Sequence, residues 1–137
     1  MEARIAHHQD SRGSKWVTHE CPTELAKLLR TFVSDEVVLV DCLTLWMNNI
    51  IYNDGYQLKQ SDIQQRVDDL VEAIESCEAT LVLVSNEVGL GVVPMGEVSR
   101  LFVDNAGWMN QAIARVATRV DFVAAGLPMT LKGGDKN

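Results

Sequence analysis

The sequence predicts an α/β domain with a mainly parallel sheet. Helical and strand patterns alternate along the 137 residues, which is the order of elements typical of parallel sheets. Two strand-length segments, 36–40 and 80–85, are apolar at nearly every position. Such strands are typical of a sheet that is buried on both faces.

The first half of the chain is expected to contain three helices and two extended segments, at residues 2–10, 16–18, 22–32, 36–40 and 43–52. The apolar residues of the second helix recur at helical spacing. The strand at 36–40 is followed by Asp41, and the turn signal Asn53-Asp54-Gly55 ends the third helix.

The second half is expected to contain two long helices and three strands, at residues 61–77, 80–85, 97–117, 120–125 and 129–131. Ser61 and Gln64 form a capping-box pattern at the start of the first of these helices. Both helices carry an apolar stripe at helical spacing. Residues 133–137 form a polar tail.

Composition and charge exclude several function classes. Twelve basic residues against nineteen acidic ones give a net charge of −7, which opposes a broad surface for nucleic acid or anionic membrane. The apolar runs have strand length, so no membrane span is predicted. The three cysteines, Cys21, Cys42 and Cys77, are spaced unlike a disulfide framework or a CxxC metal site. We therefore expect a cytoplasmic protein.

The N-terminal segment concentrates side chains suited to phosphate and nucleotide chemistry. At fixed offsets it contains His8, Arg12, Trp16, Thr18 and Glu20. A neutral imidazole can attack phosphorus, a guanidinium can hold phosphate oxygens, and a carboxylate can accept hydrogen bonds from a base or ribose. The alternative interpretation is a solvated helix with an incidental pair of histidines.

Polar residues also follow the two predicted buried strands. Ligands of open parallel sheets bind beyond the carboxyl ends of the strands, where Asp41 and Asn86-Glu87 are expected. Asp41 has the placement either of an acid that holds Mg²⁺ in a nucleotide site or of an N-cap for the next helix. Glu87 could orient a substrate hydroxyl or water, or it could simply open a tight strand-to-helix connection.

Four ordered blocks carry a family resemblance: Arg4-Ile5-x-x-His8-x-x-x-Arg12-x-x-x-Trp16-x-Thr18-x-Glu20, Val38-Leu39-Val40-Asp41-Cys42-Leu43-Thr44, Val84-Ser85-Asn86-Glu87-Val88-Gly89-Leu90-Gly91-Val92-Val93-Pro94, and Arg100-Leu101-Phe102-Val103-Asp104-x-x-Gly107-x-x-Asn110-Gln111. From Met1 to about Lys132 the sequence resembles the bifunctional adenosylcobinamide kinase / adenosylcobinamide-phosphate guanylyltransferase of cobalamin biosynthesis.

The resemblance implies a three-layer, RecA-like P-loop NTPase fold. It implies one α/β nucleotide-binding domain over residues 1–132, followed by the polar tail at 133–137. The family opens with a strand and a Gly-rich loop ending in Gly-Lys-Ser, and no segment of the 137 residues matches that loop. We therefore expect this chain to lack the first strand and the P-loop, and to be nearly inactive alone. A fragment, a misplaced start and a genuine loss are the three explanations.

The resemblance also implies two reactions. The family phosphorylates adenosylcobinamide with ATP or GTP, and then transfers GMP from GTP to that phosphate through a guanylylated histidine. It implies that His8 is the nucleophile and that GTP contacts Gln9, Asp10, Ser11, Arg12, Glu20 and Asp41. Asp41 would hold Mg²⁺, and a homo-oligomer is expected.

Two other function classes fit parts of the sequence. A non-catalytic, P-loop-related binding or assembly subunit would retain the scaffold without turnover. A generic P-loop kinase or RecA-like ATPase half would explain Asp41 but not the spacing from His8 to Glu20. For Asp104, Asn110 and Gln111 we expect structural hydrogen bonding, and for Trp16, Trp46 and Trp108 either core packing or stacking on a ligand.

Overall fold

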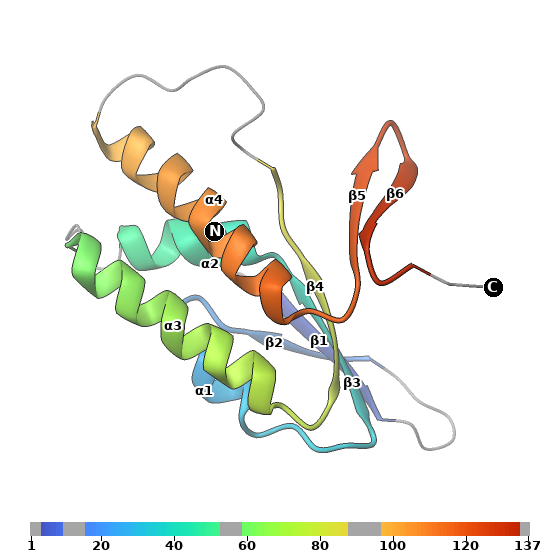
Figure 1. The fold of residues 1–137 in the computed structure, drawn as a ribbon. Helices are drawn as coiled ribbons and strands as arrows, with labels where there is room; N and C mark the ends of the chain where they lie inside the picture. Colours follow the sequence, from blue (N-terminus) through green and yellow to red (C-terminus); the bar gives the residue numbers. More distant parts are fainter. Residues whose placement is uncertain (1–3, 10–15, 53–58, 88–96, 135–137) are drawn as a thin grey trace.

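The computed structural model describes residues 4–9, 16–52, 59–87 and 97–134, with the backbone alone described at 4–9 and 97–99. The elements in these ranges are β1 Arg4–Gln9, β2 Val17–Glu20, α1 Leu25–Leu29, β3 Glu36–Asp41, α2 Leu43–Ile51, α3 Gln60–Ser76, β4 Thr80–Val84, α4 Glu97–Val116, β5 Val120–Ala124 and β6 Leu127–Lys132 (Figure 1).

The main sheet has the strand order β2-β1-β3-β4. Strands β3 and β4 are parallel, whereas β1 is antiparallel to both β2 and β3. Strands β5 and β6 form a separate antiparallel hairpin. The α/β class is thus confirmed. The prediction of a mainly parallel sheet holds for β3 and β4 alone among the described strands.

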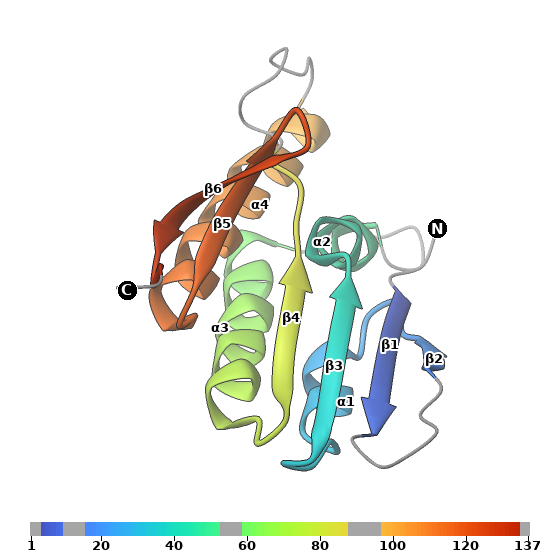
Figure 2. The same cartoon turned by 90° about the vertical axis from the view of Figure 1, so that its right-hand side faces the viewer.

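Helices lie on one side of this sheet. In Figures 1 and 2, α1, α3 and α4 share one face, and α2 lies beyond the end of β3. Within the described ranges the opposite face carries no helix, so the three layers that the family resemblance implied appear here as two. Consistent with this, β4 is not buried on both faces as predicted, because Val82 is 48% and Val84 39% exposed.

The predicted helix at residues 2–10 is wrong where the structure describes it, because residues 4–9 form β1. This strand lies between β2 and β3 and pairs with both. Backbone hydrogen bonding to two neighbours outweighs the local helical pattern, which is a weak signal over so short a segment. The extended segment predicted at 16–18 is confirmed in part, as the beginning of β2.

The other helices are confirmed with shifted ends. Helix α1 is shorter than the predicted 22–32, whereas α2 and α4 match the predicted ranges closely. The predicted capping box of α3 is wrong. Its N-cap is Lys59, which makes no side-chain capping hydrogen bond. The helix begins one residue before Ser61, so Ser61 lies inside the first turn and not at the cap.

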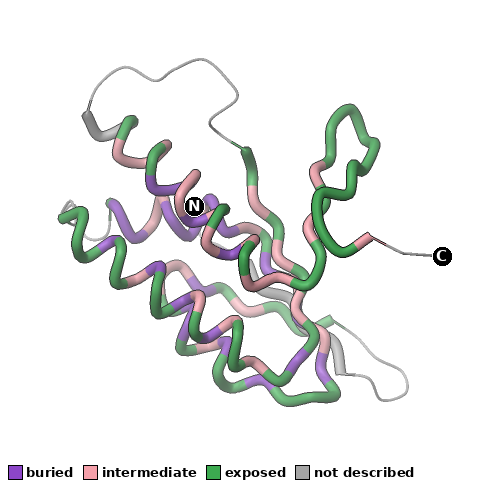
Figure 3. The backbone as a smooth tube through the Cα atoms, viewed as in Figure 1, coloured by how far each residue is buried: buried purple, intermediate pink, exposed green. Residues whose placement is uncertain are grey.

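The core lies between the sheet and its helices (Figure 3). Fully buried side chains come from α1, β3, α2, α3 and α4, and the largest are Leu25, Leu29, Val38, Val40, Trp46, Met47, Ile50, Ile51, Ile63, Leu70 and Met109. Trp46 also donates from Nε1 to the carbonyl of Thr23 at 3.1 Å, which confirms it as a core anchor. Trp16, in contrast, is 53% exposed.

Polar contacts join α4 to its neighbours. Asn105 is buried and exchanges amide hydrogen bonds with Gln60 at 2.7 and 3.0 Å, which connects α4 to the start of α3. At the other end, Lys132 Nζ donates to the carbonyls of Ala114 and Arg115 at 2.8 and 2.9 Å. A cation at the C-terminus of α4 satisfies free carbonyls and complements the helix dipole. The β5–β6 hairpin is thereby attached to α4.

Candidate functional site

The carboxyl ends of β3 and β4 lie side by side. Asp41, the last residue of β3, is exposed and pairs in register with Val84, the last residue of β4. The N-cap of α2 is Cys42, and it makes no side-chain capping bond. The N-cap interpretation of Asp41 is therefore wrong. Its carboxylate does not cap α2 and lies at the carboxyl end of the parallel strands, where ligands of such sheets bind.

A ring of hydrogen bonds organises the same edge. Ser85 Oγ donates to Asn110 Oδ1 at 2.6 Å. Because this uses the only hydroxyl hydrogen of Ser85, Thr44 Oγ1 is the donor in the 3.2 Å contact between the two hydroxyls. Thr44 Oγ1 in turn accepts from the backbone N–H of Asn86 at 2.7 Å. Asn110 Nδ2 closes the ring on the Asn86 carbonyl at 3.4 Å.

This ring joins three elements at one point. Thr44 is buried in the first turn of α2, Asn110 lies in the middle of α4, and Asn86 follows β4. Both backbone polar groups of Asn86 are satisfied, so the start of the connection after β4 is fixed while Asn86 and Glu87 stay exposed. The glycine-rich part of that connection, including Gly89 and Gly91, lies outside the described residues.

The hydrogen-bonding role expected for Asn110 is confirmed. Asp104 and Gln111, which we expected to act similarly, are both exposed on α4. Sequence reasoning gave Thr44 and Ser85 no individual role, although both stand in the blocks that carry the resemblance. Their signal was a hydroxyl close after a predicted strand, Ser85 directly after β4 and Thr44 in the first turn of α2, where it can satisfy the chain as it leaves the sheet.

Glu20 lies at the same end of the sheet as Asp41. The backbone register pairs Arg4 of β1 with Glu20 on one side and with Asp41 on the other. Glu20 is exposed. Two of the predicted nucleotide-binding carboxylates are therefore brought to one end of the sheet, two strands apart, by strands distant from each other in sequence.

His8 and Gln9 are placed at the other end of β1. Their register partners are Val37 and Glu36, at the beginning of β3. His8 is four positions after Arg4, which corresponds to about 13 Å along a strand. The side chains of His8 and Gln9, and the whole of Asp10, Ser11 and Arg12, lie outside what the structure describes. The backbone alone does not bring His8 to Asp41.

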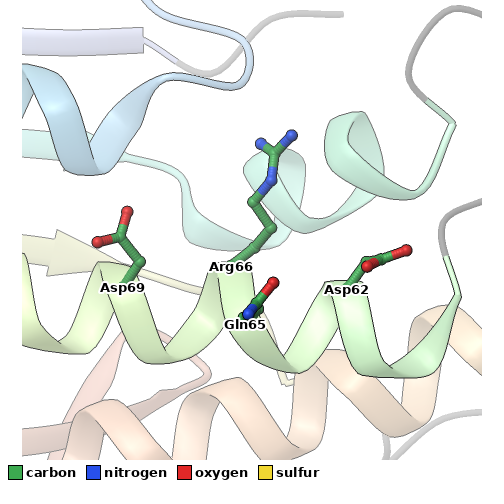
Figure 4. Close-up of a pocket in the computed structure, with 4 residues that line it drawn as sticks. All are labelled: Asp62, Gln65, Arg66 and Asp69. Carbon is green, nitrogen blue, oxygen red and sulfur yellow. The ribbon is translucent and has the colours of Figure 1, made fainter.

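A surface pocket of about 360 Å³ lies on α3 and is lined by Asp62, Gln65, Arg66 and Asp69 (Figure 4). All four belong to one helix, and Arg66 stands between two carboxylates at helical spacing. Asp69 is already paired with Arg30 at 2.9 Å. Two carboxylates and one arginine do not favour a phosphate, so we interpret this pocket as a solvated helix face.

The donor set at the strand ends fits a metal ion bound together with a nucleotide. Among the residues that the structure describes, no group of three or more His, Cys, Asp or Glu side chains could hold a metal ion. Mg²⁺ commonly uses only one or two carboxylates, with phosphate oxygens and water completing its shell. A single exposed carboxylate at Asp41 meets that requirement.

Two further properties concern the cysteines and the helices. The three cysteines, Cys21, Cys42 and Cys77, are free thiols. Burial raises the pKa of Cys21 more than its backbone hydrogen bond lowers it. Over the described ranges, no helix has the length and apolar character required to cross a membrane.

Comparison with known proteins identifies the family of this chain. Residues 1–131 match the family described as cobinamide kinase / cobinamide phosphate guanyltransferase. A similar protein is the bifunctional adenosylcobalamin biosynthesis protein CobP of Pseudomonas aeruginosa, 48% identical over 97% of this chain and 75% of its own length. Two more relatives are the bifunctional adenosylcobalamin biosynthesis proteins CobU of Salmonella typhimurium and Escherichia coli. They are 36% and 35% identical to this chain, and each match covers 96% of this chain and 78% of the relative's length. The chain therefore belongs to the cobinamide kinase / cobinamide phosphate guanyltransferase family.

Proposed function

We propose that this protein is a bifunctional transferase of adenosylcobalamin biosynthesis. It phosphorylates the free hydroxyl of adenosylcobinamide with ATP or GTP, and it then transfers GMP from GTP to the new phosphate, giving adenosylcobinamide-GDP. The observation that carries the proposal is the family match over residues 1–131, together with 48% identity to a relative named for this biosynthesis. Nucleotide substrates and free thiols favour a cytoplasmic location.

In the kinase step, Asp41 would hold the metal ion that accompanies the nucleotide. Bound Mg²⁺ would neutralise phosphate charge, and phosphoryl transfer depends mainly on positioning and charge stabilisation. Three features support this role for Asp41: its exposure, its place at the carboxyl end of β3, and its freedom from the N-cap of α2. Glu87, exposed after the end of β4, orients the acceptor hydroxyl.

In the guanylyl transfer step, His8 acts as the nucleophile. An imidazole nitrogen attacks the α-phosphorus of GTP, a P–N bond forms, and the bond to the β-phosphate breaks to release pyrophosphate. A phosphate oxygen of the corrinoid then attacks the same phosphorus and the imidazole leaves. A covalent intermediate divides one transfer between two large anions into two displacements. The support for His8 is its position in the Arg4-Ile5-x-x-His8 pattern.

The neighbours of His8 complete the proposed GTP site. Gln9, Asp10, Ser11 and Arg12 flank the nucleotide, and Glu20 accepts hydrogen bonds from the guanine or ribose. The sequence of 137 residues contains no Gly-Lys-Ser loop to cradle a triphosphate. We therefore propose that these residues alone turn over slowly, because most of the triphosphate charge is left unbalanced.

A two-stage assay tests the proposed function. The protein is expressed as these 137 residues and, separately, together with any in-frame coding sequence that precedes Met1. Each is incubated with adenosylcobinamide, Mg²⁺ and either ATP or GTP, and corrinoids are separated and weighed by mass spectrometry. We expect the monophosphate with either nucleotide and the GDP adduct with GTP alone. If the longer form yields neither product, the proposal fails and a non-catalytic subunit becomes the better account.

A further inference from the structure

The hydrogen-bonded ring after β4 uses three side chains to hold one residue of backbone. Thr44 Oγ1 accepts from the Asn86 N–H at 2.7 Å, and Asn110 Nδ2 donates to the Asn86 carbonyl at 3.4 Å. Ser85 Oγ connects these two side chains through contacts of 3.2 Å to Thr44 and 2.6 Å to Asn110. Both backbone polar groups of Asn86 are thus held from two different helices, α2 and α4.

Satisfying the Asn86 carbonyl does not by itself require a side chain. Asn86 is exposed, and its bond from Asn110 is also exposed to solvent. Water can satisfy an exposed carbonyl at little cost in free energy. The amide of Asn110 adds a fixed position instead, because its two ends bond to Ser85 and Asn86, which are neighbours in the chain.

The ring joins the chain segments that carry two exposed carboxylates. Strands β3 and β4 point to the same end of the sheet, where α2 begins (Figure 2). Asp41 ends β3, and Thr44 follows it by three residues. Asn86 lies two positions after Val84, the register partner of Asp41, and Glu87 comes next. The 2.7 Å bond between Thr44 and Asn86 therefore sets how these two segments lie relative to each other.

We propose that Asn110 and Thr44 are positioning residues of the kinase step. They contact no substrate. They act through the backbone of Asn86, and they fix the segment of Glu87 relative to that of Asp41. The inference rests on the proposed function, in which Asp41 would hold the metal ion and Glu87 orients the acceptor hydroxyl. Phosphoryl transfer is sensitive to such positioning, because a displacement of about 1 Å can lower a rate about 100-fold.

Helix α4 provides both the rigid base for Asn110 and a matched control. Met109, the residue before Asn110, is fully buried in the core. Asn105, one turn earlier on the same helix, is also buried and exchanges amide hydrogen bonds with Gln60 at 2.7 and 3.0 Å. Asn105 is thus the same residue type in the same helix, with hydrogen bonds that lead to α3 and not to the ring.

The test measures steady-state phosphorylation of adenosylcobinamide by the protein expressed with any in-frame sequence that precedes Met1, below the melting range of every variant. A positioning role predicts a loss of kcat at unchanged KM for the nucleotide. We expect Asn110→Ala to lower kcat at least about tenfold with KM within about twofold. Asn105→Ala should keep kcat within about twofold, although it leaves a buried amide without its partner. Equal losses of kcat in the two variants, or a rise in KM alone, overturn the proposal.

Position 44 offers a rescue by a conservative change. Thr44→Val removes the hydroxyl that accepts from Asn86, whereas Thr44→Ser retains it. Both changes cost stability, one through a lost hydrogen bond and the other through a lost methyl group, so stability alone does not separate them. We expect Thr44→Val to lower kcat at least about tenfold and Thr44→Ser to stay within about threefold of the unchanged protein. A Thr44→Ser variant as slow as Thr44→Val overturns the proposal.

A readout without turnover separates this inference from the proposed function. The backbone amide resonances of Asn86 and Glu87 are followed while Mg²⁺ and a non-hydrolysable GTP analogue are added. Both should shift in the unchanged protein and in Asn105→Ala, and should shift at least about twofold less in Asn110→Ala, where the ring no longer fixes them. A protein that shows this pattern but forms no corrinoid phosphate contradicts the proposed function and retains the positioning role. Equal shifts in Asn110→Ala and Asn105→Ala, or none in the unchanged protein, overturn the positioning role.

Discussion

Ser85 Oγ donates a hydrogen bond to Asn110 Oδ1 at 2.6 Å, which joins the residue after β4 to the middle of α4. Around this bond the hydroxyl of Thr44 and the backbone of Asn86 complete a closed ring. In such a ring each group donates to the next, so the bonds support one another. The exit of the chain from β4 is therefore fixed beside Asp41.

Removing the amide of Asn110 should destabilise the fold. Asn110→Ala leaves the Ser85 hydroxyl and the Asn86 carbonyl without this partner, at a cost of about 1–3 kcal/mol. Urea denaturation measures the change in the free energy of unfolding. Gln111→Ala, on the exposed side of the same helix, is the matched control and should cost less than about 0.5 kcal/mol. Equal effects of the two variants would show that the ring contributes nothing beyond helix propensity.

The ring should also appear as coupling between its members. Thr44→Val retains the shape of a buried side chain and removes its hydroxyl. Because Thr44 and Asn110 both bond to Ser85 and Asn86, the double variant should cost less than the sum of the single ones, by about 0.5–3 kcal/mol. A double-mutant cycle in urea measures this difference. Strict additivity would mean that the two side chains act independently.

Asp41 should matter for activity and not for stability. Asp41→Asn retains the shape of an exposed side chain and removes the charge that would hold Mg²⁺. We expect the melting temperature to stay constant, while kinase and guanylyl transfer rates of the active protein both fall by about 100-fold. Parallel melting and rate measurements check this. A lowered melting temperature with normal rates would assign Asp41 a structural role instead.

The β5–β6 hairpin should loosen in acid. A side-chain hydrogen bond from Thr130, and then the bond from Arg119 at 3.0 Å, lower the pKa of Asp121 below its ordinary value of 3.8. Since the folded pKa is the lower one, the stabilisation is present above the unfolded value and is lost as pH falls through the folded pKa. Amide NMR shifts of the hairpin should therefore move below about pH 4. Asp121→Asn should remove this transition, and its persistence would assign it to another group.

Most of the interior elements could be predicted from the sequence, because their periodicity is strong and local. Helix α4 and strand β3 match their predictions within two residues. The N-terminal segment was mistaken for a helix because its strand character comes from two partners, β2 and β3. The open face of β4 was missed for a related reason: an apolar strand predicts a covering layer without showing where that layer comes from.

The position of the charged residue Asp41 in the candidate site could be predicted from the sequence. The contacts of the residues that support the site could not. Asp41 stands at the end of an apolar run, which is visible in the sequence. The partnership of Thr44 with Ser85 spans 41 positions and depends on how β4 lies beside β3. Glu20 and Asp41 likewise reach one edge only because β1 pairs with both of their strands. Such relationships depend on the arrangement of the strands and leave no local pattern.

Guanylylation of His8 tests the central claim most directly. The protein, expressed with any in-frame sequence preceding Met1, is incubated with Mg²⁺ and GTP labelled at the α-phosphate, then denatured and exposed to acid or alkali. A P–N bond to histidine predicts a label that is lost in acid and retained in alkali. The label should disappear in His8→Ala and persist in His7→Ala. A protein that labels equally well without His8 would contradict the assignment of the nucleophile, and a protein that is never labelled would contradict the covalent route.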